Sequence, residues 1–151
     1  QVVVEEAIAE RILSEDFAER FYTKSALNTT RMSNYLEMPH NSAYDLVACI
    51  TNEADATSLH LILDSIIARA AKLTAVNLSA AVLKSEVGEN PRYPVCINAD
   101  GTTYYKTENL ARYTEQYVTE FLQRRHHRYV RFVNIGDSPT IGAAVAGLSI
   151  L

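Results

Sequence analysis

The sequence predicts a single α/β domain over residues 1–151, with a helical segment (1–88) followed by a β-β-α-β-α segment (89–151). Three observations indicate this class. A long helix rich in small residues is expected at about 57–87, and Asp100-Gly101 separates two short strand-like stretches. A third strand, at 128–135, leads into a helix that opens on Gly142. This order is typical of an α/β domain, but the strands that would complete its sheet are missing.

The helical segment is expected to begin with three short helices. Ser14 or Asp16 would cap the second, because their side chains can accept a hydrogen bond from a first-turn N–H. Thr29 would begin the third, and Pro39 would end it, because a residue before proline avoids the α region. The stretch 44–50 is left open between strand and helix. Helical spacing places these apolar residues on the inner face of the first helix, 2–13: Val3, Val4, Ala7, Ile8 and Ile12.

The long helix is expected to end at Gly88, a residue type that favours helix C-termini. Small side chains dominate its middle, so we expect the helix to be buried on most of its circumference. These small residues are Ala68, Ala70, Ala71, Ala75, Ser79, Ala80 and Ala81.

The second segment is expected to open with a hairpin of strands 93–99 and 102–106. The Asp100-Gly101 pair between them accepts the positive φ angles of a type I′ turn. Thr107 would cap the next helix, and a final helix would cover 141–148 after the third strand. The apolar face of the helix after Thr107 comprises Leu110, Tyr113, Tyr117, Val118, Phe121 and Leu122.

Composition excludes several functional classes. The chain is 48% hydrophobic and 21% charged with a net charge of -4, which argues against nucleic-acid and membrane partners. No apolar run approaches the roughly 20 residues of a membrane span. We expect no signal peptide, because the start Q-V-V-V-E-E-A lacks a basic n-region and a cleavage site. Cys49 and Cys96 lack metal or redox spacing and are expected to be reduced thiols in the cytoplasm. Because the chain begins mid-helix without Met, we expect further sequence before Gln1.

No catalytic or metal site is predicted. Ser138 follows a strand in a Gly-Asp-Ser turn, as in some esterases, but no Asp, Glu or His follows it to complete a triad. The four histidines have no metal-ligand spacing. The basic cluster 124–128 is interpreted as a solvated helix end, where cations suit the helix dipole, rather than a phosphate site.

The turn from 136 to 142 leaves two interpretations open. A helix N-terminus offers unpaired N–H groups, and the small residues Gly142, Ala143 and Ala144 would let a phosphorylated or flat ligand approach the backbone. Alternatively, the same small residues would only let the helix pack closely on the sheet. The residues themselves favour neither.

Four stretches, in order, resemble motifs of the hexokinase family. Residues 21–33, F-Y-T-K-S-A-L-N-T-T-R-M-S, are similar to the family's F-x-T-K-x-x-F-x-T-x-F-x-S, and Arg69-Ala70-Ala71 is similar to T-R-A-A. Residues 100–106, D-G-T-T-Y-Y-K, are similar to D-G-S-x-Y-x-K, and 142–144 match G-A-A. The resemblance covers nearly the whole chain. It implies the C-terminal part of the large domain, with an incomplete ribonuclease-H-like fold of the actin/hexokinase type.

The resemblance implies a parent enzyme that transfers the γ-phosphoryl group of ATP, with Mg²⁺, to the 6-hydroxyl of a hexose. This part would supply the adenosine side of the ATP site, through Thr29, Ser33, Asp137, Ser138, Thr140 and Gly142. The family's D-G-S-G-x-G turn becomes D-S-P-T-I-G at 137–142, so it loses two glycines and gains a proline.

The family's catalytic aspartate, phosphate loops and sugar-binding carboxylates precede this region, so the fragment alone is not expected to phosphorylate a sugar. Its expected partners are hexose and ATP in the full-length protein and the rest of its own chain. A catalytically inactive, kinase-derived module that binds sugar or nucleotide is the alternative.

Overall fold

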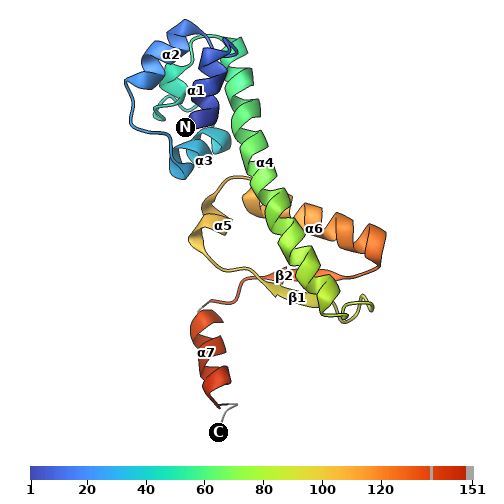
Figure 1. Ribbon diagram of the computed structural model, residues 1–151. Helices are drawn as coiled ribbons and strands as arrows, with labels where there is room; N and C mark the ends of the chain where they lie inside the picture. The colour runs from blue at the N-terminus through green and yellow to red at the C-terminus, as the bar shows by residue number, and fades with distance from the viewer. Residues whose placement is uncertain (137, 149–151) are drawn as a thin grey trace. The chain divides into compact units, whose positions relative to one another are not determined.

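The computed structural model describes residues 1–136 and 138–148 and separates into two compact units. The N-terminal unit comprises Gln1–Ala70 together with Lys106–Leu110, and the C-terminal unit comprises Ala71–Tyr105 and the residues from Ala111 onward. The boundary falls inside the long helix α4 (Glu53–Lys84), which contributes to both units (Figure 1). The single domain expected from the sequence stays a prediction.

The N-terminal unit is built from short helices that precede α4 (Figure 1). They are α1 (Val2–Ala9), α2 (Glu15–Tyr22), α3 (Thr29–Glu37) and the 3₁₀ helix η1 (Val47–Cys49). Aromatic and branched aliphatic side chains supply its buried core. The largest of these are Phe17, Phe21, Tyr35, Leu13, Leu46, Leu59 and Leu63.

Side-chain caps fix the starts of α2 and α3. Ser14 is the cap of α2, since its hydroxyl accepts a hydrogen bond from the Phe17 N–H at 3.2 Å. Asp55, only 2% exposed, accepts bonds from the Ser14 N–H at 2.9 Å and hydroxyl at 2.5 Å, which joins α2 to the start of α4. α3 begins at Thr29, as predicted, and ends at Glu37, shortly before Pro39.

The first helix is shorter than predicted. α1 ends at Ala9, and Arg11 has a φ of 57°, a left-handed conformation that ends the helix before residue 13. Ile12 lies beyond this helix end and is 56% exposed, and Val3, within α1, is 50% exposed, so neither faces the core as expected. The sequence left residues 44–50 undecided between strand and helix. In the structure they form neither a strand nor an α-helix, and their one regular element is the 3₁₀ helix η1.

The helix α4 begins four residues before the predicted start at 57 and ends at Lys84. The prediction that most of its circumference is buried is wrong, because Leu61, Leu73 and Val76 are each more than 60% exposed. The buried residues of α4 recur every four residues and once after three, so they form a single stripe along the helix. The stripe comprises Asp55, Leu59, Leu63, Ile67, Ala71, Ala75, Ser79 and Val82.

By length and composition alone, α4 could cross a membrane, with a mean hydropathy of 1.5 in its most apolar window. The expectation that no apolar stretch approaches this length is therefore wrong. Mostly buried core helices pass the same test, but only 28% of this window of α4 is buried within the described structure.

The C-terminal unit contains a two-stranded parallel sheet. β1 (Val95–Asn98) lies beside β2 (Val130–Val133) (Figure 1), and Val95 is paired with Val130. The helices α5 (Thr102–Lys106) and α6 (Leu110–His126) separate the strands, and α7 (Ser138–Leu148) follows β2.

The predicted hairpin is wrong, so the order after residue 89 is β-α-α-β-α. Residues 102–106 form α5 rather than a second strand. Val95 N–H donates to Tyr129 O at 2.9 Å and Ala99 N–H donates to Val133 O at 3.0 Å, so the hydrogen bonds of β1 go to a distant strand. Gly101 keeps the expected positive φ, at 116°, in a connection that enters a helix. Helix α6 starts at Leu110, so Thr107 does not cap it.

The core of the C-terminal unit joins one face of the sheet to α4 and α6. Its buried centre is Ala75, Val82, Val118 and Leu122, and partly buried residues that pack against it include Leu78, Val95, Ile97, Val130 and Phe132. The sheet carries its apolar residues on this face because alternate residues of a strand point to the same side. The resulting α/β packing is compatible with the predicted class.

Candidate functional site

The predicted nucleotide contacts fall in both units. Thr29 is the first residue of α3 and is exposed, whereas Ser33, one turn later, is only 6% exposed. Thr140 and Gly142 lie in α7 and are exposed. Ser138 is the first residue of α7, and Asp137 lies outside the described residues. The structure thus brings Thr29 and Ser33 together on one helix, and Thr140 and Gly142 on another.

Both hydrogen-bonding functions of the Ser33 hydroxyl are used inside the N-terminal unit. It donates to Lys106 O at 2.9 Å and accepts from the Glu108 N–H at 2.7 Å. These bonds hold the segment after α5 against α3. The Thr29 hydroxyl, in contrast, makes no hydrogen bond to the described residues and is free to meet a ligand. Nucleotide contact by either residue stays a prediction.

The cation closest in sequence to Thr29 has a structural partner. Arg31 forms a bidentate salt bridge with Asp45, with Nη2–Oδ2 at 2.8 Å and Nε–Oδ1 at 3.0 Å. Its Nη1 also donates a hydrogen bond to Ser25 O. Cys49 is buried beside this pair, with its sulfur 3.2 Å from Asp45 O. Burial raises the pKa of the Cys49 thiol, which disfavours the reactive thiolate. The Arg31 guanidinium is therefore already engaged in holding two loops together, and the Cys49 thiol stays protonated.

Among the described residues of α7, Gly142 and Gly147 do not pack closely against another segment. A Cβ added at Gly142 or Gly147 would meet nothing within 4 Å. The apolar side chains of the helix are also exposed, with Ile141 at 52%, Val145 at 61% and Leu148 at 71%. Of the two interpretations of this helix, tight packing therefore has no support among the described residues.

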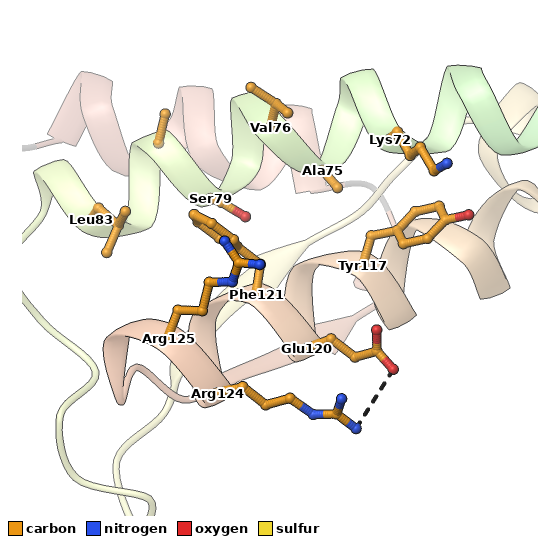
Figure 2. A pocket seen from close by; sticks show the side chains of 11 residues that line it. Lys72, Ala75, Val76, Ser79, Leu83, Tyr117, Glu120, Phe121, Arg124 and Arg125 are labelled. Carbon is orange, nitrogen blue, oxygen red and sulfur yellow. Dashed lines mark ion pairs between the residues drawn. The ribbon is translucent and has the colours of Figure 1, made fainter.

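A groove between α4 and α6 is a feature of the C-terminal unit that sequence reasoning missed (Figure 2). It has a volume of about 770 Å³. Both helices contribute apolar and charged side chains, which are Lys72, Ala75, Val76, Ser79, Ala80, Leu83, Tyr117, Glu120, Phe121, Arg124 and Arg125. The signal in the sequence was a second apolar row on α4 (Leu73, Val76, Ala80 and Leu83), at the three- and four-residue spacing of a helix face.

The basic cluster 124–128 separates into side chains with different surroundings. Arg124 lies 3.9 Å from Glu120, one helical turn earlier, and Arg128 lies 2.6 Å from Glu89. Arg125 lines the groove. Because the three arginines do not converge, this geometry agrees with a helix end rather than a phosphate site.

Two tyrosines have strongly shifted pKa values but no catalytic surroundings. Burial, with a smaller effect from Glu53, raises the pKa of Tyr35 to about 12, and its hydroxyl lies 3.1 Å from Ala56 O. Burial also raises the pKa of Tyr104 well above its usual range, with the Glu115 carboxylate adding to the shift. Both hydroxyls therefore keep their protons. Within residues 1–136 and 138–148, no three His, Cys, Asp or Glu side chains are grouped so as to hold a metal ion.

A family model described as hexokinase matches residues 1–149 of the chain. No curated protein and no solved structure matches it. The match includes all four stretches in which the sequence resembles hexokinase motifs.

Proposed function

The chain belongs to the hexokinase family, and from this premise we propose that it forms the C-terminal part of an ATP-dependent sugar kinase. The match over residues 1–149 is the observation that carries the proposal. The parent enzyme would transfer the γ-phosphoryl group of ATP to the 6-hydroxyl of a hexose, with Mg²⁺ neutralising charge on the phosphates. Hexose and ATP are then its substrates in the full-length protein.

Within that enzyme, we assign this chain to the adenosine side of the nucleotide site. Thr29 offers an exposed hydroxyl at the start of α3, and Thr140 offers another in the first turn of α7. Neutral hydroxyls suit a ribose or a base better than a triphosphate, which needs cations or metal ions. Arg31, the cation near Thr29, is already paired with Asp45. The residues present therefore fit the adenosine end of ATP, and other parts of the parent would hold its phosphates and Mg²⁺.

The sugar hydroxyl must lose a proton to a carboxylate during phosphoryl transfer. None of the family motifs in this chain supplies that base, so we place it elsewhere in the parent. The free thiols Cys49 and Cys96 suit a reducing compartment, which supports a cytoplasmic location for the enzyme.

One observation favours the alternative of an inactive binding module. α7 is already helical from Ser138, so Pro139 occupies its first turn, where proline is well tolerated. The family's glycine-rich turn is thus replaced here by the start of a helix. An altered turn of this kind would weaken nucleotide contact and would suit a protein that binds sugar without phosphorylating it.

A coupled ADP-release assay on the full-length gene product, with glucose, fructose and mannose, tests the proposal. We expect turnover of at least one hexose. Thr29→Ala and Thr140→Ala should raise KM for ATP and leave KM for the hexose unchanged, because they remove hydroxyls on the nucleotide side only. Thr30→Ala, an exposed neighbour on α3, is the matched control and should change neither constant. Absence of turnover with every hexose would contradict the enzyme and favour the binding module.

A further inference from the structure

We propose that the groove between α4 and α6 binds a small amphipathic anion, with an apolar body and one carboxylate or sulfonate group. The groove lies wholly within the C-terminal unit, and none of the predicted nucleotide contacts lines it. The inference therefore does not depend on the kinase assignment.

The size and floor of the groove fit an apolar body. Its volume of about 770 Å³ falls within the roughly 300–1,000 Å³ that is common for small-molecule sites. Val76 is 65% exposed and Phe121 is 38% exposed, so the groove presents apolar surface that the chain leaves uncovered. Covering these side chains with an apolar ligand would remove them from water, which favours binding. Between them, α4 and α6 supply the apolar floor residues Ala75, Val76, Ala80, Leu83 and Phe121.

The charges around the groove select an anion. Three cations and one carboxylate line it, and the carboxylate, Glu120, already has Arg124 as its partner. Figure 2 shows the Glu120–Arg124 pair on the side of α6 away from α4. Lys72 lies over the Tyr117 ring, with its Nζ 5.5 Å from the ring centroid. With Glu120 paired to Arg124, Lys72 and Arg125 leave the groove with a net positive charge.

Arg125 is the cation best placed to meet a ligand's charged group. Figure 2 shows its guanidinium extending beside Phe121 towards Ser79 on α4, across the groove. It makes no hydrogen bond or ion pair with any residue that the structure describes. A planar guanidinium next to an apolar floor can pair with a carboxylate or sulfonate while the rest of the ligand covers Phe121. A neutral apolar ligand would instead desolvate Arg125 without a counter-charge, which costs free energy.

Titration of the full-length protein with anilinonaphthalene sulfonate, followed by the fluorescence of the dye, tests the proposal. This probe has a flat apolar body and a single sulfonate. We expect saturable binding at one site, and we expect Arg125→Glu to weaken it by about tenfold, which corresponds to about 1.4 kcal/mol. Val76→Glu places a negative charge on the floor and should weaken binding similarly. Both residues are exposed, so the two variants should keep the circular dichroism spectrum of the unsubstituted protein.

Lys84→Glu is the matched control, because it makes the same charge change on α4 at an exposed residue outside the groove. Lys84→Glu should leave the affinity for the sulfonate within about twofold of that of the unsubstituted protein. Phenylnaphthylamine, an uncharged analogue, should bind more weakly than the sulfonate and should not respond to Arg125→Glu.

The proposal is overturned if Arg125→Glu and Lys84→Glu have equal effects, or if the uncharged analogue binds as well as the sulfonate. It is also overturned if sedimentation shows a dimer that Val76→Glu dissociates, because the groove would then be an interface between copies. None of these outcomes bears on hexose turnover, which is measured separately.

Discussion

Replacing Ser33 by alanine should destabilise the N-terminal unit through two specific hydrogen bonds. The Ser33 hydroxyl is 6% exposed and joins α3 to the Lys106 carbonyl and to the Glu108 N–H, at 2.9 and 2.7 Å. Each intramolecular hydrogen bond contributes about 1 kcal/mol net, so losing both costs about 2 kcal/mol. Alanine is the better helix former by about 0.5 kcal/mol, which offsets part of the loss. We therefore expect Ser33→Ala to lower the free energy of unfolding by about 1.5 kcal/mol.

Urea unfolding followed by circular dichroism measures this change. With a slope of about 1.5 kcal/mol per molar urea, the midpoint should fall by about 1 M at unchanged slope. Thr29→Ala, at an exposed position on the same helix, is the control and should change stability by less than about 0.5 kcal/mol. A Ser33→Ala midpoint equal to that of the control would refute the structural role of this hydroxyl. A loss of ATP affinity at equal stability would instead assign Ser33 to the ligand.

Three further predictions follow from backbone geometry, titration and burial. Gly88→Ala should lower the free energy of unfolding by about 2–4 kcal/mol, because residue 88 has a φ of 88° and its new Cβ would lie 2.7 Å from Val95 Cγ2. Thermal denaturation measures this change, and an unchanged midpoint would contradict the geometry. Since the pKa of Tyr35 is raised to about 12 from 10.0, the stabilisation it brings is complete below pH 10 and is lost as the pH rises towards 12. Tyr35→Phe should flatten that decline in alkaline denaturation, and an identical profile for the two proteins would count against it. A thiol reagent should label the exposed Cys96 in the folded chain and the buried Cys49 only on unfolding, as mass spectrometry of the labelled peptides would show. Equal labelling rates of the two cysteines in the folded chain would argue against the burial of Cys49.

Local signals in the sequence were the most informative about helix starts. Ser14 caps α2 and Thr29 begins α3, because a cap depends on one side chain and the N–H groups of the next turn. The end of α1 was missed because Arg11 adopts a left-handed conformation that its residue type does not indicate. The contacts proposed at Thr29, Ser33, Thr140 and Gly142 come from resemblance to a family, and the structure supplies their exposure and partners but no ligand.

The sequence by itself determined the family, the long helix and the starts of α2 and α3, through residue patterns that are local or shared with relatives. The tertiary structure decided which strand pairs with β1, which face of α4 is buried and where a groove remains open. Asp100-Gly101 suits a hairpin, yet β1 pairs with β2 more than thirty residues later. Strand pairing and burial depend on which distant segments compete for the same backbone and apolar surface. The groove likewise exists only because α4 and α6, distant in the sequence, pack beside each other (Figure 2).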